Sequence, residues 1–267
     1  MSVPKGITDN YPELSTRCIL AGYRGSIAHG MYVKPSEPTS IDDKDVMYVC
    51  VPNIDYYYGF APGFGSNKVF PTNGTREIKR DEWDIVVYEA KKFIGLLAQG
   101  NPNVLAMLWL EPNLYITKTP AGEMLLNNRN LFVGRHVYKS FVGYAYSQLH
   151  RMTHNAFEGH MGEKRKALVQ KFGFDCKNGA HLIRLLRMGI EFLKDGELYV
   201  LREDASQLLE IKKGEWTLEQ VKSEADRLFI AAETAYQNST LPSKPDYAKI
   251  NKLSIDIISL AMDIFGS

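Results

Sequence analysis

A glycine–serine pair and two closely spaced aspartates are the residues of this chain best suited to chemistry. Gly25 and Ser26 follow one apolar segment, and Asp43 and Asp45 lead into the next. Side chains alternate along a strand, so these two carboxylates would point the same way. Carboxylates together with substrate phosphates suit Mg2+, and a small Gly-Ser turn lets backbone N–H groups and a hydroxyl approach a phosphate. The pattern indicates phosphoryl transfer assisted by paired metal ions.

A third carboxylate is needed to complete such a site. Asp84 lies in the segment EWDIVVY, and it fits the role of a base or of a second-metal ligand. A less specific interpretation is open as well, because a lone pair of aspartates is usually a solvated turn. Asp81, Glu82 and Asp84 could then be the exposed, charged start of a strand. The order of strand, Gly-Ser, loop, Asp-x-Asp, strand and a further strand with Asp favours the site.

The segment FDCKNGAHLIRLLRMG combines a helical pattern with a basic side. Lys177, His181 and Arg184 recur at helical spacing on one face, and Arg187 lies near that face. A basic stripe opposite an apolar one is expected of a helix that faces a triphosphate or an RNA backbone. A solvated helix surface is the alternative, and spacing alone favours it slightly.

The elements that must position these residues change in type along the chain. Apolar segments in the front half predict strands at 17–23, 45–51 and 82–88, followed by a helix at 89–99. The Tyr-, Gly- and Pro-rich segment 52–74 fits no element period, so we expect a long ordered loop of a kind that is usually functional. The back half has a helical pattern throughout, with helices expected at 135–151, 176–193, 217–236 and 247–265. The change from strands with helices to a purely helical pattern falls near residues 115–135.

Composition indicates a folded protein without a strong charge of either sign. The chain has 267 residues, 45% of them hydrophobic, and a formal net charge of +1, which excludes a disordered tail or a disulfide scaffold. Its three cysteines are far apart and contain no CxxC pair, so a reducing compartment is expected. The polar N-terminus and the short apolar runs predict neither a signal peptide nor a membrane span. A cytoplasmic location and no membrane partner are therefore expected.

Three motif blocks in order resemble a known family: GSIAHG…SIDDKDVMYVCVP, then DIVVYEAKKFIGLLAQGNPNVLAMLWL, then FDCKNGAHLIRLLRMGIEFLKDGEL. They are similar to the RlaP-like, RNA-repair-pathway DNA polymerase beta family, and the resemblance covers roughly residues 18–265. It implies an α+β fold: a polymerase-beta-type nucleotidyltransferase domain with a small mixed sheet over 1–125, followed by an all-α domain over 126–267.

The resemblance also implies an activity. The expected reaction is metal-dependent transfer of a nucleoside monophosphate from an NTP such as ATP to a hydroxyl acceptor, with release of pyrophosphate. An RNA 3′ end, tRNA-like or damaged, is the first acceptor expected, in keeping with RNA repair. A protein hydroxyl is the alternative acceptor, and a non-catalytic nucleotide-binding regulator of the same fold is the alternative to an enzyme. Two ions of Mg2+, or of Mn2+, are the expected cofactors.

Carried over residue by residue, the family motifs assign nucleotide binding to Gly25 and Ser26 and assign catalysis and metal binding to Asp43, Asp45 and Asp84. Because the resemblance includes the helical block, nucleotide binding is also expected of Lys177, His181 and Arg184.

The chain departs from the pattern in three places. In the turn, Ile27 stands where arginine often follows the serine, and His29 stands where an aromatic residue such as tyrosine is frequent. The spacing from Gly-Ser to Asp-x-Asp is lengthened by residues 34–40, and Lys44 stands where an apolar or aromatic residue is more usual. Lys44 could neutralise charge near the metals or could point away from them.

Other features have weaker implications. His150 and His154 are one helical turn apart and could bind zinc, but no acidic or cysteine partner is near them in sequence. The charged run 163–171 is expected to be a helix exterior that a polyanion could touch. The aromatic stretch 56–60 could stack on bases or fasten the long loop to the sheet, and the two interpretations are equally open.

Overall fold

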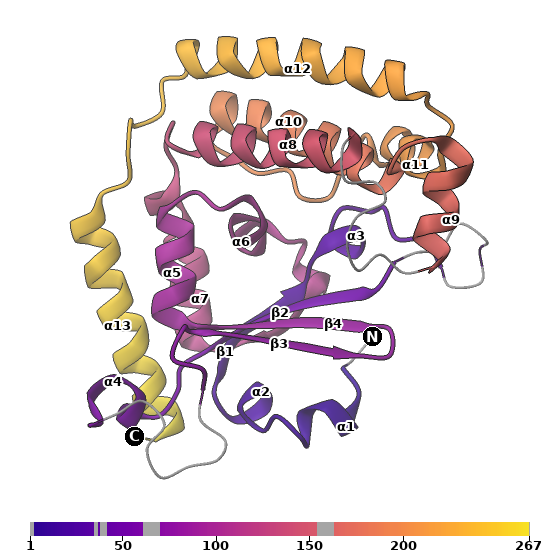
Figure 1. Ribbon diagram of the computed structural model, residues 1–267. Helices are drawn as coiled ribbons and strands as arrows, with labels where there is room; N and C mark the ends of the chain where they lie inside the picture. The colour runs from indigo at the N-terminus through magenta and orange to yellow at the C-terminus, as the bar shows by residue number, and fades with distance from the viewer. Residues whose placement is uncertain (1–2, 35–36, 38–41, 61–69, 154–162, 267) are drawn as a thin grey trace.

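The computed structural model describes residues 3–34, 37, 42–60, 70–153 and 163–266. Within them one five-stranded sheet has the order β3-β4-β2-β1-β5, with strand bounds β1 Cys18–Tyr23, β2 Lys44–Cys50, β3 Thr75–Arg80, β4 Trp83–Glu89 and β5 Tyr115–Lys118. β2 and β4 are parallel, and the other neighbours are antiparallel. A layer of helices lies over one face of this sheet (Figure 1). The expected small mixed sheet is confirmed.

The pleat of β2 decides which side chains face the helices. Val46, Tyr48 and Cys50 belong to the core on one face of the sheet, which also holds Ile7 and Leu14 of the N-terminal segment. The residues between them, Met47 and Val49, belong to the larger core that continues into the helices. Because side chains alternate with a period of two, Asp45 shares the helix-covered face of Met47.

The three strands expected from apolar segments correspond to β1, β2 and β4. β3 and β5 were missed because neither has the pattern of a buried strand. β3 is the charged segment TREIKR with a single buried side chain, Ile78, and it pairs only with β4 at the sheet edge. The expected loop 52–74 contains the short helix α4 (Ile54–Tyr58), and residues 61–69 lie outside the described part of the chain.

Short helices of the front half connect and cover the strands. Their bounds are α1 Lys5–Thr8, α2 Glu13–Thr16, α3 Gly25–Ala28, α5 Ala90–Ala98, α6 Pro102–Leu105 and α7 Pro120–Asn127, with 3-10 turns at Ala106–Trp109, Pro112–Leu114 and Arg129–Phe132. The carboxylate of Glu89 caps α5 by accepting from two backbone N–H groups, and the side chain of Asn101 caps α6 in the same way. Such caps satisfy donors that a helix leaves unpaired at its start. The expected helix 89–99 is confirmed.

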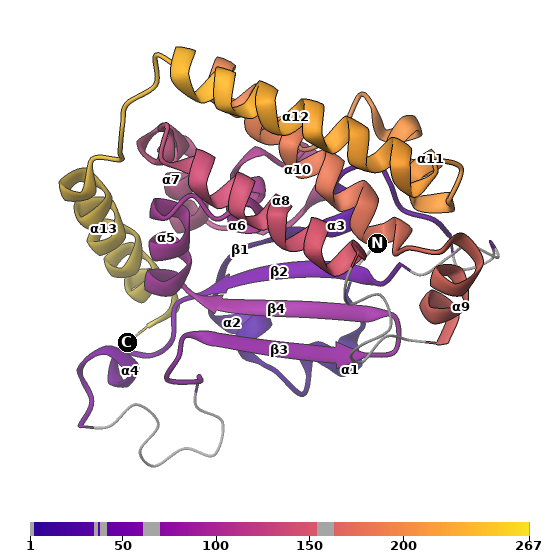
Figure 2. The ribbon, with the colours of Figure 1, turned by 45° about the horizontal axis from the view of Figure 1, so that its top comes forward.

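The back half is helical, as expected. Its helices are α8 Val137–Thr153, α9 Glu163–Phe172, α10 Cys176–Asp195, α11 Ala205–Lys213, α12 Leu218–Asn238 and α13 Tyr247–Phe265. The capping box of Thr217 and Gln220 is present at the start of α12. α10 packs against α8, α11 and α12, whereas α13 returns to pack against α5 and α7 of the front half (Figures 1 and 2). One continuous core spans both halves, and the expected domain boundary at 125/126 stays a prediction.

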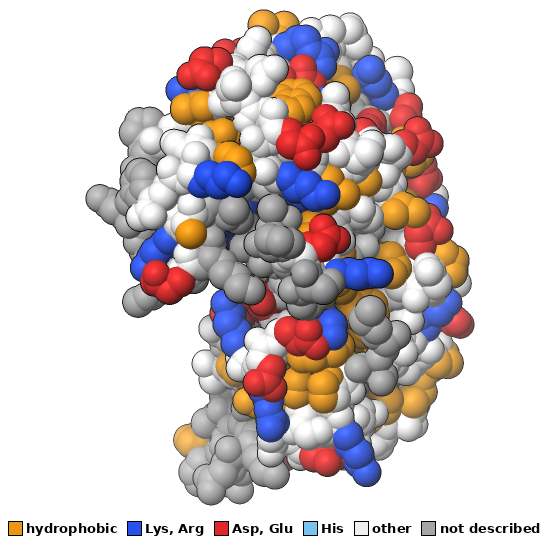
Figure 3. All heavy atoms as spheres, turned by 90° about the vertical axis from the view of Figure 1, so that its right-hand side faces the viewer, with side chains coloured by type: hydrophobic (Ala, Val, Ile, Leu, Met, Phe, Trp, Pro, Cys, Tyr) orange, Lys and Arg blue, Asp and Glu red, His pale blue; other side chains and the backbone are white. Residues whose placement is uncertain are grey.

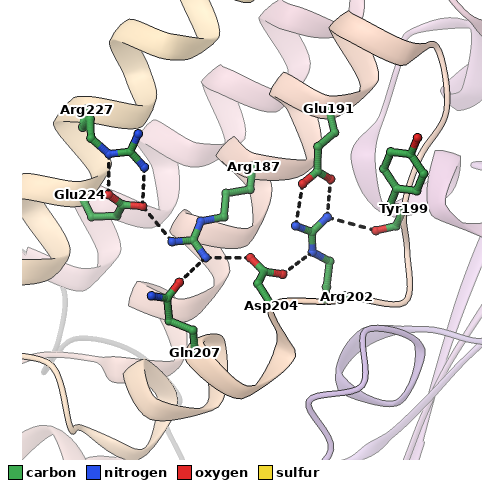
Figure 4. A network of polar contacts seen from close by, with 8 residues as sticks. All are labelled: Arg187, Glu191, Tyr199, Arg202, Asp204, Gln207, Glu224 and Arg227. Atoms are coloured by element: carbon green, nitrogen blue, oxygen red, sulfur yellow. Dashed lines mark hydrogen bonds and ion pairs between the residues drawn. The ribbon is translucent and has the colours of Figure 1, made fainter.

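A network of ion pairs fixes the connection between α10 and α11 (Figure 4). Arg187 of α10 donates to Asp204 at 2.7 Å and to Glu224 of α12 at 2.8 Å. Arg202 binds the same Asp204 from the other side at 2.8 Å and also pairs with Glu191. Several charges that share partners in this way position a segment better than isolated surface pairs do. The connection held in place includes Val200, which contacts the site described next.

None of the helices in the described part of the chain combines the length and the apolarity that a membrane span needs.

Candidate active site

A cavity of about 180 Å³ lies where the Gly-Ser turn and β2 meet the helices α6, α10 and α11. Residues far apart in the sequence form its wall. Six of the eight predicted site residues line it, namely Gly25, Ser26, Asp45, Lys177, His181 and Arg184. Asp43 and Asp84 do not line it. The hydroxyl oxygen of Ser26 is buried and has no hydrogen-bond partner, so it is available to a ligand group in the cavity.

Only glycine fits at position 25. Its φ of 60° lies in the left-handed region, which side chains with a Cβ rarely adopt. A Cβ built there would also stand 2.3 Å from Oδ2 of Asp45. The backbone of the turn therefore rests directly against the carboxylate.

Asp45 and Asp84 are neighbours on parallel strands and share one cation. They are direct register partners in the pairing of β2 with β4, so both lie on the helix-covered face. Arg24 Nη2 is 3.6 Å from Oδ1 of Asp45 and 3.4 Å from Oδ1 of Asp84. Burial raises the pKa of Asp45 to about 6; Arg24 and Lys177 lower it, and Asp84 and Asp43 raise it. The three predicted acids are thus close enough to influence one another electrostatically.

The carboxylates of Asp43, Asp45 and Asp84 are oxygen donors of the kind that suits a hard divalent cation. Asp45 and Asp84 converge more closely with each other than with Asp43. Asp43 is exposed immediately before β2, and among the described residues no three His, Cys, Asp or Glu side chains are grouped closely enough to hold a metal ion. Carboxylate oxygens are the ligands that Mg2+ prefers. Asp45 and Asp84 already require a positive charge between them, which Arg24 supplies here. Cations held by these acids would relieve the same repulsion.

A buried ion pair joins the two halves beside the cavity. Lys212 of α11 lines the cavity, donates to the carboxylate of Asp42 and donates to the carbonyl of Met31 at 2.9 Å. Lys177 Nζ is 3.5 Å from the other oxygen of Asp42. Desolvation lowers the pKa of Lys212, and the charge of Asp42 opposes that shift. Lys177 and Lys212 thus place two positive charges beside the cavity, near the carboxylates of Asp42 and Asp45.

Two histidines in the cavity wall are uncharged. Burial lowers the pKa of both His29 and His181 to well below the usual value, and the nearby Arg184 lowers them further. His29 Nδ1 is 2.8 Å from the carbonyl oxygen of Val200. Because a carbonyl can only accept, Nδ1 carries the proton and Nε2 has a lone pair to offer.

A family model described as the RNA repair pathway DNA polymerase beta family, RlaP, matches residues 9–256. The chain belongs to the RlaP family. It is therefore a member of the polymerase beta superfamily, with a mixed α+β fold and C-terminal helices. A search against curated proteins gave no match.

The RlaP chain was also compared with solved structures. The CD-NTase CdnG of Bradyrhizobium diazoefficiens, in complex with GTP, is 11% identical in sequence, and the alignment covers 100% of this chain and 95% of that chain with a TM-score of 0.22. A TM-score of that size does not establish a shared arrangement of the site.

Two of the departures from the RlaP pattern, Lys44 and Ile27, have structural explanations. Lys44 lies on the opposite face of β2 from Asp45, where it pairs with Glu82 and lies 5.1 Å from the ring centroid of Trp83. Lys44 therefore points away from the acids, which was one of the two roles that the sequence left open for it. Ile27 packs against the core on that same outer face of the sheet.

Several sequence-based interpretations concerned residues outside the cavity. Arg187 does not join the face of Lys177 and Arg184, because it binds Asp204 and Glu224 instead. The hydroxyl of Tyr57 donates to Glu89 at 2.6 Å, and the ring of Tyr56 contacts Phe70 edge-on. These two tyrosines fasten their segment to the fold, whereas the neighbouring Tyr58 is exposed. The charged run 163–171 forms α9. His154 of the predicted zinc pair lies outside the described residues.

Sequence reasoning missed Asp42 and Lys212. One usable signal existed for Lys212, because it follows Leu208 and Ile211 at helical spacing, which predicts a position on the buried face of α11. No signal of this kind marked Asp42, whose side chain is only 1% exposed. Its neighbour Asp43 has the same chemistry but is exposed.

Proposed function

We propose that this protein transfers a nucleoside monophosphate from an NTP to a hydroxyl acceptor, with an RNA 3′ end as the acceptor and with release of pyrophosphate. The observation that carries the proposal is the composition of the cavity wall. The Gly25-Ser26 turn, the carboxylate of Asp45 and the cationic side chains of α10 and α11 all line one cavity. A triphosphate needs the cations and the turn, whereas an attacking hydroxyl needs the carboxylates.

The residues divide the work between binding and activation. Lys177 and Lys212 attract the triphosphate, and the unpaired hydroxyl of Ser26 donates to a phosphate oxygen. Asp84, whose side chain is 23% exposed, orients the acceptor hydroxyl and receives its proton. Positioning and electrostatic stabilisation supply nearly all of the catalysis in such reactions.

Asp43, Asp45 and Asp84 are the residues proposed to hold two Mg2+ or Mn2+ ions. When bound, such ions activate an attacking oxygen and stabilise a leaving one. Arg24 would leave its position between Asp45 and Asp84 and become free to contact the leaving pyrophosphate. The contact of Arg24 with both acids also favours a second candidate, a nucleotide-binding regulator in which arginine permanently replaces the metals.

The described residues on one face of the molecule carry both signs of charge. Where Figure 3 shows described residues, Lys and Arg side chains are interspersed with Asp and Glu side chains. RNA would therefore be held near the cavity rather than along this face, since backbone contacts provide most of the affinity for RNA.

The test is transfer of label from each α-labelled NTP, with Mg2+ or Mn2+, in the presence and absence of bulk RNA. A variant carrying both Asp43→Ala and Asp45→Ala is the control for the carboxylates. Label in RNA that disappears in the variant supports the proposal and identifies the base. Label on protein moves the acceptor to a polypeptide. Nucleotide binding without transfer in any condition, unchanged in the variant, supports the regulator instead.

A further inference from the structure

Arg184 is a buried cation without a counterion. Its side chain is 3% exposed, and its Nε has no hydrogen-bond partner. Nη1 lies 3.1 Å from the sulfur of Met188, a weak acceptor. No carboxylate of the described residues forms an ion pair with it, although the chain has ion pairs on both sides of it, at Lys177 and Arg187. Burying a charge without a partner is costly, so this guanidinium is prepared for something that enters the cavity.

The charge of Arg184 persists in this environment. Burial lowers its pKa only to about 10, so it stays protonated at neutral pH. Asp204 acts on it through space, but the carboxylate of Asp204 is already bound by Arg187 and Arg202 (Figure 4). Among the described residues, Arg184 donates only to the sulfur of Met188, so these residues do not meet its requirement for acceptors.

The surroundings of Arg184 differ from those expected for phosphate. His29, His181 and Tyr144 are among its polar neighbours in the wall, and burial keeps both histidines neutral. Apolar side chains, including Ala106, Met107 and Leu110, form much of the remaining wall. Phosphate sites usually bring several charges together, as Lys177 and Lys212 do at Asp42. One planar donor among uncharged groups is instead typical of a site that orients a flat, largely apolar ligand.

The position of Arg184 along α10 supports the same distinction. It follows Lys177 by seven residues, which corresponds to about 10 Å along a helix axis at 1.5 Å per residue. Lys177 lies beside Asp42, which also binds Lys212, and it acts electrostatically on Asp45. If the triphosphate binds there, the α-phosphate and ribose carry the base toward Arg184.

We propose that Arg184 reads the nucleotide base by donating two parallel hydrogen bonds to O6 and N7 of guanine, so that GTP is the preferred nucleotide. The proposal rests on the function proposed above, because it takes the nucleotide to bind in this cavity. Guanine presents two adjacent acceptors on one edge, whereas adenine pairs an acceptor with an amino donor that a guanidinium cannot satisfy.

Guanine also suits the neutral histidine beside Arg184. Its N1–H and N2 amino groups are donors, and the free Nε2 lone pair of His29 is an acceptor in the same wall. Cytosine is the competitor that remains, because O2 and N3 are also adjacent acceptors. It has one donor group beside them and a smaller apolar face, so it matches the wall less completely.

The experiment is equilibrium binding in the presence of Mg2+, measured for GTP, ATP, CTP, inosine triphosphate, 7-deaza-GTP and inorganic tripolyphosphate. Inosine triphosphate retains O6 and N7, 7-deaza-GTP lacks the N7 acceptor, and tripolyphosphate has no base. The proteins are the wild type, Arg184→Met and the control Arg227→Met. Arg227 is an arginine on the surface of α12 whose side chain is 65% exposed, so its loss changes the net charge equally without touching the cavity.

We expect the wild type and Arg227→Met to favour GTP and inosine triphosphate over ATP and CTP by about 10- to 100-fold, the range of one bidentate base contact. The wild type should bind 7-deaza-GTP with much less preference over ATP and CTP than it shows for GTP. This comparison between GTP and 7-deaza-GTP uses the wild type alone, so it does not depend on how well a variant folds. Arg184→Met should bind all the nucleotides at the level of ATP and should bind tripolyphosphate as the wild type does.

Each of the other outcomes contradicts a specific part of the proposal. Equal affinity for all nucleotides, or a preference for ATP or CTP, overturns base reading while the proposed function survives. A parallel loss of tripolyphosphate binding in Arg184→Met assigns Arg184 to a phosphate and overturns the proposal. Failure of the folded wild type to bind any nucleotide or tripolyphosphate overturns the nucleotide site itself, and base reading with it.

Discussion

Replacing Gly25 with alanine is the sharpest test of the geometry around Asp45. The added Cβ would stand 2.3 Å from Oδ2 of Asp45, 2.9 Å from its Cγ and 3.2 Å from its Cβ. Ordinary contact begins at 3.4 Å, so the carboxylate group must move by roughly 1 Å. All three contacts are made to one flexible side chain rather than to backbone. We therefore expect the fold to survive and the acid to be displaced.

Gly30→Ala is the matched control. Gly30 also has a positive φ, 72°, but a Cβ there would meet Cδ1 of Leu201 at 3.2 Å and no polar group. Each variant should lose about 1–3 kcal/mol of unfolding free energy, the cost of a left-handed residue other than glycine. Only Gly25→Ala should lose activity, by about 100-fold, because a displacement of this size at a reacting group has that effect.

Urea unfolding measures the unfolding free energy of each variant, and label transfer from the NTP measures its activity. Equal activity in Gly25→Ala and Gly30→Ala, at matched stability, would refute the inference that Asp45 works from the position it occupies against the turn. A much larger loss of stability in Gly25→Ala than in Gly30→Ala would show that the contact is structural.

Two further predictions concern stability and reactivity. Lys212→Met removes the cation of a buried pair and leaves Asp42 with Lys177 and the backbone N–H of Val33, so we expect a loss of about 3 kcal/mol in unfolding free energy; the exposed Lys222→Met should change it by less than about 0.5 kcal/mol. A loss of less than about 1 kcal/mol for Lys212→Met would contradict the assignment of a tight buried pair. All three cysteines are buried, and burial raises the pKa of Cys176 to about 12. Because only a thiolate reacts, a thiol reagent at pH 8 should find no fast-reacting group in the native protein and three after unfolding; a rapid native reaction would show that one cysteine is accessible.

Much of the fold could be predicted because its signals are local. The capping box of α12, the alternation along β2 and the period of α10 are each complete within one segment of the chain. β3 could not be predicted in this way, since its segment TREIKR forms a strand only because β4 supplies its hydrogen-bond partners. Isolated edge strands have no intrinsic pattern strong enough to identify them.

The sequence by itself determined which residue types are available for chemistry and on which face of β2 or α10 each one lies. Backbone period alone places Asp45 with Met47 and away from Lys44, and it places Lys177, His181 and Arg184 on one side of a helix. Only the tertiary structure decided which of these charges are paired. Asp42 meets Lys212 across 170 residues of sequence, Arg187 is bound by partners on two other elements, and no carboxylate in the described part of the chain pairs with Arg184. The physical reason is that a charge is compensated through space, over a few ångströms, and folding brings those partners together from any distance along the chain.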